Sequence, residues 1–137
     1  MATLAIDYGD RHIGLAVSTV AGPMPLDPVD LKTQIWNERV SHIIEQYDID
    51  QIVVGYSTGN AELLAKVKGF CTALQGLSSL PVELADESMT SQWAESMLRS
   101  FELPTRAVKA KSHSVAAVKL LMAYEEGKKR GVLSFSK

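Results

Sequence analysis

The sequence is poor in cysteine and contains no long apolar run. Its single cysteine, Cys71, excludes a disulfide framework and a structural zinc site built from several thiolates, and it favours a reducing compartment. No apolar run approaches the roughly 18 residues of a membrane span. The N-terminus opens into a strand pattern without a charged leader or an apolar signal core. We therefore expect a cytoplasmic protein that does not associate with membranes.

The composition is not that of a disordered chain. Hydrophobic residues make up 46% and charged residues 22% of the 137 residues, so there are enough apolar side chains for a full core. A length of this order is typical of one domain, for which roughly 100–150 residues is common. We expect a single domain over residues 1–126 and a basic C-terminal tail over residues 127–137.

Basic side chains are scarce in the first part of the chain and concentrated in the last. Residues 1–98 hold five basic and 13 acidic side chains, whereas residues 99–137 hold nine basic and three acidic ones. This asymmetry is expected if the C-terminal third contacts a polyanion such as nucleic acid. The candidate phosphate-binding residues are Arg106, Lys109 and Lys111, together with Arg11 near the N-terminus. A solvated helix face followed by a basic tail explains the charges equally well.

Apolar periodicity predicts an α/β domain. Strands are expected at residues 3–7, 13–18 and 52–54, in an irregular edge segment around Pro25 and Pro28, and from residue 82 to Asp86-Glu87. Helices are expected near residues 36–47, 63–74, 93–101 and 112–126. An antiparallel meander followed by alternating helices and strands indicates a mixed β-sheet flanked by α-helices.

Acidic residues end two of the expected strands. Asp7 closes the first strand before the Gly9 turn, where metal coordination, a bound cation or a salt bridge would offset the cost of burying a carboxylate. Capping of the turn is the simpler alternative. Asp86-Glu87 ends another strand, and strand ends collect active-site groups in open α/β sheets. Asp86 could equally mark the start of the helix that follows.

A histidine begins the terminal helix. His113 lies in the first turn, and Ala117 one turn later places it on the side that faces the core. The pair Ala116-Ala117 would let the helix approach a sheet closely. Together with the two strand-end acids, His113 would complete a constellation for metal-dependent phosphoryl transfer, whereas a lone histidine is otherwise usually structural.

Five motifs follow one another along nearly the whole chain. They are Leu4-Ala5-Ile6-Asp7-Tyr8-Gly9, Ile13-Gly14-Leu15-Ala16-Val17-Ser18, Ile52-Val53-Val54-Gly55, Asp86-Glu87-Ser88-Met89-Thr90 and Ala116-Ala117-Val118-Lys119-Leu120-Leu121. In order and spacing they resemble the YqgF family, also called RuvX, which is similar to the Holliday-junction resolvases of the ribonuclease-H-like superfamily. The resemblance implies a ribonuclease-H-like fold and a nuclease that trims the precursor of small-subunit ribosomal RNA. It also implies that Asp7 and Glu87 are the catalytic acids.

The sequence departs from the family pattern at the site itself. His113 stands where the family has an aspartate, which replaces a hard oxygen ligand with a nitrogen. Ser88 replaces a customary arginine, and the segment from Tyr56 to Asn60 is shorter than the usual glycine-rich loop. We expect Asp7, Glu87 and His113 to act in catalysis and, with Asp86, to bind Mg²⁺ or Mn²⁺, with Mn²⁺ favoured if His113 is a ligand.

Three functions are consistent with these residues. The first is a metal-dependent endonuclease that processes the 5′ end of pre-16S ribosomal RNA in ribosome biogenesis, with ribosome precursors as partners and a branched DNA junction as the second substrate. The second is an RNA-binding assembly protein whose catalysis is impaired by His113. The third, a nucleotide phosphotransferase, is disfavoured because such enzymes clamp ATP between two domains and 137 residues provide one. Both a monomer and a homodimer remain open.

Overall fold

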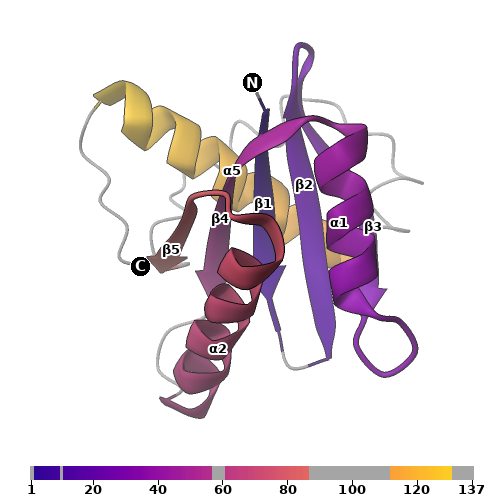
Figure 1. The fold of residues 1–137 in the computed structure, drawn as a ribbon. Coiled ribbons are helices and arrows are strands. Elements are labelled where there is room, and N and C mark those ends of the chain that lie inside the picture. Colours follow the sequence, from indigo (N-terminus) through magenta and orange to yellow (C-terminus); the bar gives the residue numbers. More distant parts are fainter. Residues whose placement is uncertain (1, 10, 57–60, 87–111, 131–137) are drawn as a thin grey trace.

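The computed structural model describes residues 2–9, 11–56, 61–86 and 112–130 (Figure 1). In chain order the elements are β1 (Ala2–Tyr8), β2 (His12–Thr19), β3 (Gly22–Asp30), α1 (Trp36–Gln46), β4 (Ile49–Tyr56), α2 (Ala61–Ser78), β5 (Val82–Asp86) and α5 (Ser112–Arg130). The strands form one sheet in the order β3-β2-β1-β4-β5. The β1–β2 and β2–β3 pairs are antiparallel, and the β1–β4 and β4–β5 pairs are parallel. The predicted mixed sheet with flanking helices is confirmed.

Most element boundaries lie close to those expected. The proline-containing strand β3 is an edge strand, as predicted, because proline cannot donate to a central ladder. Helix α5 continues to Arg130, past the expected end near residue 126, so residues 127–130 extend the helix. Lys128, Lys129 and Arg130 are good helix formers whose positive charge suits a helix C-terminus. The helix expected near residues 93–101 and the tail from residue 131 lie outside the described residues.

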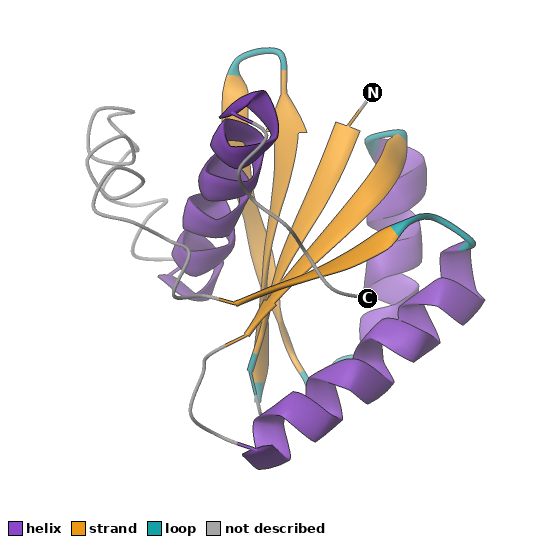
Figure 2. Ribbon diagram, turned by 90° about the vertical axis from the view of Figure 1, so that its left-hand side faces the viewer, coloured by secondary structure: helices purple, strands orange, loops and turns teal. Residues whose placement is uncertain are grey.

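The two faces of the sheet differ in side-chain size. Helices α1 and α2 cover one face and α5 covers the other (Figure 2). The face toward α1 and α2 carries large buried side chains, among them Leu4, Ile6, Leu15, Ile52 and Val54. The face toward α5, here called the α5 face, carries small ones, among them Ala5, Ala16 and Ala85. Since residues alternate between faces along a strand, this difference lets α5 pack closely on the sheet.

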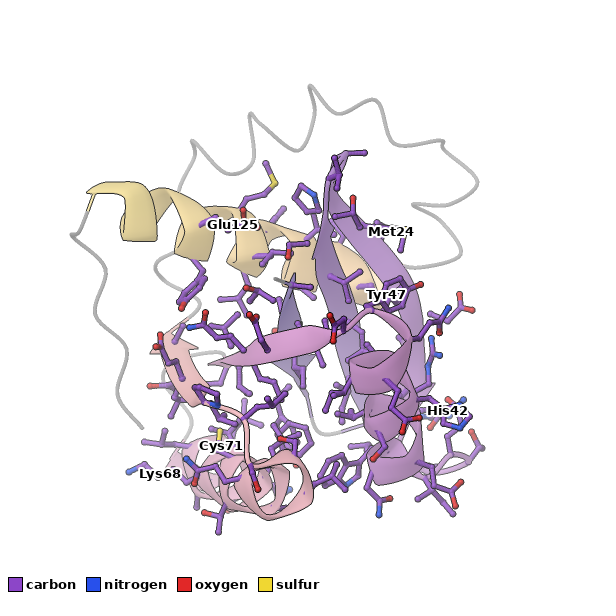
Figure 3. All side chains as sticks on the ribbon, turned by 45° about the horizontal axis from the view of Figure 1, so that its top comes forward. Met24, His42, Tyr47, Lys68, Cys71 and Glu125 are labelled. Carbon is purple, nitrogen blue, oxygen red and sulfur yellow. The ribbon has the colours of Figure 1, made fainter. Side chains whose placement is uncertain are left out.

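Figure 3 shows this division in two labelled side chains. Cys71 lies on α2, whereas Glu125 lies on α5 across the sheet. Cys71 is buried within the cluster that joins α1 and α2 to the sheet, as is common for a free cysteine. None of the helices in the described parts of the chain is long and apolar enough to cross a membrane.

Candidate functional site

Asp7 lies near the carboxyl end of β1, at the sheet edge where the parallel strands β1, β4 and β5 all end. It pairs with Gly55 of β4, and the next β4 residue, Tyr56, pairs with Asp86 of β5. The two strand-end acids predicted from the sequence therefore lie at the same edge, with β4 between their strands. In open α/β sheets this edge is where ligands bind.

The neighbours of Asp7 on the α5 face are both glycines. Asp7 pairs with Gly14 of β2 on one side and with Gly55 of β4 on the other, and it shares the α5 face with Ala5. The two strand positions directly opposite the partly buried Asp7 therefore place no side chain beside it. On the β4 side, Leu120 of α5 packs over Gly55, where a Cβ would lie 2.7 Å from Leu120 Cδ2. On its β4 side, the position of Asp7 therefore has a glycine partner that is covered by an apolar side chain from α5.

The turn after Asp7 is tight for a steric reason. A Cβ at Gly9 would lie 2.9 Å from the carbonyl oxygen of His12, so glycine alone fits at this point of the β1–β2 hairpin. The turn that the sequence predicts here is confirmed, and it holds the end of β1 against the start of β2.

The first turn of α5 is attached to the sheet by Ser114. Its side chain is fully buried; its hydroxyl donates to the carbonyl oxygen of Leu26 at 2.5 Å and accepts from the backbone N–H of Leu15 at 3.0 Å. His113 directly precedes Ser114, so its backbone lies at the start of α5, as predicted, over β2 and beside the strand that carries Asp7.

The other half of α5 is attached at β4 and β5. Gln51 Nε2 donates to the hydroxyl of Tyr124 and to Glu83 Oε1, the latter at 3.3 Å. Burial, and then the negative charge of Glu83, raise the pKa of Tyr124 to about 12. Helix α5 therefore crosses the whole sheet, from β2 and β3 at Ser114 to β4 and β5 at Tyr124.

Arg11 lies in the turn before β2 at the edge that also holds Asp7. Its side chain is 55% exposed, and Nη2 lies 3.4 Å from Asp30 Oδ2. The backbone N–H of Lys32, and secondarily Arg11, lower the pKa of Asp30 below its ordinary value. An exposed pair of this kind contributes little to stability, so the guanidinium is available to other anions.

The structure brings some of the predicted site residues together and does not describe others. Asp7 and the backbone of Asp86 lie at the edge where the parallel strands end, and Arg11 lies in the turn before β2 at the same edge. The backbone of His113 lies in the first turn of α5. Glu87, Arg106, Lys109 and Lys111 lie outside the described residues. Within the part of the chain that is described, no group of three or more His, Cys, Asp or Glu side chains is placed to hold a metal ion.

Sequence reasoning did not identify four residues that shape this site, namely Gly14, Gly55, Leu120 and Ser114. The two glycines stand within quoted motifs, but their position beside Asp7 depends on strand register. Ser114 follows the flagged His113 and carries no periodic signal of its own. Serine is common in the first turn of a helix, so its presence there does not indicate a hydrogen bond to the sheet.

Comparison with known proteins identifies the family. Residues 1–126 match the family model described as "RuvX: Holliday junction resolvase". A protein of Pelotomaculum thermopropionicum named "Putative pre-16S rRNA nuclease" is 31% identical over 138 residues, covering 95% of this chain and 90% of that protein. A protein of the same name from Rickettsia typhi is 33% identical over 125 residues, covering 86% of this chain and 80% of that protein.

Solved structures show the same fold. RuvC of T. thermophilus in complex with a Holliday junction substrate matches with a TM-score of 0.68 at 19% identity, covering 99% of each chain. The Holliday junction resolvase of fowlpox virus matches with a TM-score of 0.59 at 16% identity, covering 93% of this chain and 99% of that one. The ribonuclease-H-like fold expected from the motifs is confirmed. Because the family model and the curated relatives span nearly the whole chain, this protein belongs to the RuvX family.

Proposed function

We propose that this protein is a divalent-metal-dependent endonuclease that processes the 5′ end of pre-16S ribosomal RNA. The observation that carries the proposal is the placement of Asp7. Asp7 lies near the carboxyl end of β1, at the edge where the parallel strands end, and its partners on the two neighbouring strands are both glycines. The names of the curated relatives supply the RNA substrate, and the family name supplies a DNA junction as the alternative.

The surroundings of Asp7 fit a divalent cation. The partly buried carboxylate of Asp7 is a hard oxygen ligand, and the glycines directly opposite it on both neighbouring strands place no side chain between it and a bound ion. Glu87, Asp86 and His113 would hold the ion together with Asp7. When bound, a pair of such ions would stabilise the attacking and leaving oxygens of a phosphodiester.

The chain's own residues hold the substrate and shape the site. Arg11 lies at the same sheet edge as Asp7. Its guanidinium leaves the carboxylate of Asp30 and binds phosphate oxygens of the nucleic acid. Arg106, Lys109 and Lys111 add positive charge from the C-terminal part of the chain. Leu120 packs over Gly55, the β4 partner of Asp7, and would exclude water from that side of the site. A ribosomal RNA substrate would place this activity in the cytoplasm, with ribosome precursors as partners.

His113 determines which metal is used. An imidazole in place of a carboxylate favours Mn²⁺ over Mg²⁺, which prefers oxygen ligands. If the imidazole prevented metal binding altogether, the protein would bind ribosomal RNA without cleaving it.

A substrate comparison tests the proposal. Pre-16S ribosomal RNA, an unrelated single-stranded RNA and a four-way DNA junction are incubated with the purified protein in Mg²⁺ or Mn²⁺, beside Asp7→Asn as the control for contaminating nucleases. We expect cleavage at the 5′ end of the pre-16S RNA. Cleavage of the junction alone would support a resolvase, and binding without cleavage of any substrate would support the assembly protein.

A further inference from the structure

The pairing of β2 with β3 is irregular next to the candidate site. Ile13 pairs with Val29 and Leu15 pairs with Leu26, so two β3 residues, Asp27 and Pro28, lie opposite the single β2 residue Gly14. This is a β-bulge in the edge strand, a feature that often lies beside active sites and redirects a strand. Gly14 is also the β2 partner of Asp7, so the bulge lies one strand away from that carboxylate.

The hydroxyl of Ser114 joins the two strands at this bulge. It accepts from Leu15 N–H at 3.0 Å and donates to the carbonyl oxygen of Leu26 at 2.5 Å. Leu15 and Leu26 form the first regular pair after the bulge. One side chain from α5 therefore completes the hydrogen bonding of two strands in a fully buried place, where an unsatisfied backbone group would be costly.

Ser114 is not placed as an ordinary helix cap. It is the third residue of α5, which begins at Ser112, and its hydroxyl bonds to the sheet. Both partners are distant in sequence, with separations of 99 residues for Leu15 and 88 for Leu26. The contact thus tethers the first turn of α5 to β2 and β3.

We propose that Ser114 is a positioning residue for the nuclease site. By bridging Leu15 and Leu26 at the bulge, it holds the first turn of α5, and with it the backbone of His113, beside the Gly14–Asp7 pair. This inference rests on the proposed function, since it assigns to Ser114 the alignment of the two elements that would hold the metal. Residues that hydrogen-bond directly to metal ligands typically change metal affinity by about 10–100-fold when they are replaced. Ser114 acts less directly, through the backbone of Leu15 and Leu26, so its effect should lie at the lower end of this range.

The test compares Ser114→Ala with Val118→Ala in the full chain. Val118 is also buried in α5, one turn later, but it contributes apolar packing alone to the α5 face. The affinity of each variant for Mn²⁺ is measured by electron paramagnetic resonance. In a second experiment without metal, NMR gives the amide chemical shifts and the hydrogen exchange of Asp7, Gly14 and Leu15.

We expect Ser114→Ala to weaken Mn²⁺ binding about tenfold, to speed exchange of the Leu15 amide, and to shift the amides of Gly14 and Asp7. Val118→Ala should leave Mn²⁺ affinity within about twofold and those amides in place. Ser114→Thr, which retains the hydroxyl, should preserve both properties and serves as the second variant if Ser114→Ala does not fold. The inference would be overturned if the two alanine variants had equal effects or if Ser114→Ala bound Mn²⁺ with wild-type affinity. It would also be overturned if Ser114→Thr folded but showed shifted amide resonances of Asp7 and Gly14.

Failure of the proposed function gives a different result. If the wild-type protein bound no Mn²⁺ and cleaved no substrate, the nuclease proposal would fall. The metal-free NMR comparison would still decide whether Ser114 positions α5 beside Asp7: unchanged amides in Ser114→Ala would refute it, and shifts confined to that variant would support it.

Discussion

Leu120 of α5 packs so closely on Gly55 of β4 that a Cβ added to Gly55 would lie 2.7 Å from Leu120 Cδ2 and 3.2 Å from Cδ1. Leu120 is almost fully buried, so it cannot move aside without disturbing the core of the α5 face. Gly55 is also the β4 partner of Asp7. The glycine therefore sets both the approach of the helix and the space beside the carboxylate.

Gly55→Ala should destabilise the protein and reduce cleavage. We expect the free energy of unfolding to fall by about 1–3 kcal/mol, as for other overpacked cores, because Leu120 must shift. The measurement is urea unfolding followed by circular dichroism.

The matched control for this substitution is Gly69→Ala. Gly69 is an exposed residue of α2 with no atom within 4 Å of an added Cβ. Alanine there should raise stability by about 0.5–1 kcal/mol, because glycine is a poor residue in a helix interior. If Gly55→Ala were as stable as Gly69→Ala, the result would contradict the close packing of α5 on β4.

Cys71 makes stability depend on pH in the alkaline range. Burial raises the pKa of its thiol from 9.0 to about 11. Between these values the unfolded chain loses the thiol proton while the folded protein keeps it, so the free energy of unfolding contributed by this group falls as the pH rises. Cys71→Ala should therefore lose stability less steeply than the wild type from pH 9 to 11.

The measurement is the difference in urea unfolding between the two proteins across that pH range. Lysine and tyrosine side chains that titrate in the same range are common to both proteins and cancel in the difference. Parallel stability curves would show that the thiol titrates alike in the folded and unfolded states.

His113→Asp should change the metal preference of the reaction. Restoring a carboxylate where the family has one should raise the ratio of the Mg²⁺-supported to the Mn²⁺-supported cleavage rate, on the order of tenfold. The control is His42→Asp, a substitution at an exposed position of α1, which should leave the ratio unchanged. A ratio that is the same in wild type and His113→Asp would mean that His113 does not reach the metal.

Local patterns predicted those parts of the fold that depend on neighbouring residues. The alternation around Asp7 identifies a strand with an acid at its end, and Pro25 and Pro28 mark β3 as an edge strand. The apolar stripe of α5 fades near Glu126 and therefore predicts too early an end, because Lys128 to Arg130 continue the helix without it.

Features that depend on pairing across the chain could not be read from local patterns. Gly14 and Gly55 flank Asp7 because of strand register. Two strands and a helix lie between Asp7 and Gly55 in the chain, so no local pattern connects them. Ser114 acts on Leu15, 99 residues away. No periodicity of α5 encodes that contact, because it arises only when the helix crosses the bulge of β2 and β3.

Asp7 is proposed to anchor the nuclease site, and the single-turnover rate of cleavage at the 5′ end of pre-16S ribosomal RNA tests this role. Wild type, Asp7→Asn and Asp48→Asn are compared with the same metal. Asp48 is an exposed residue between α1 and β4, at the opposite sheet edge, and its φ of 54° is tolerated by asparagine. We predict that Asp48→Asn cleaves at the wild-type rate, and that Asp7→Asn is slower by about 100-fold or more, because losing a metal ligand removes several kcal/mol of transition-state stabilisation. Cleavage by Asp7→Asn at the wild-type rate would contradict the account.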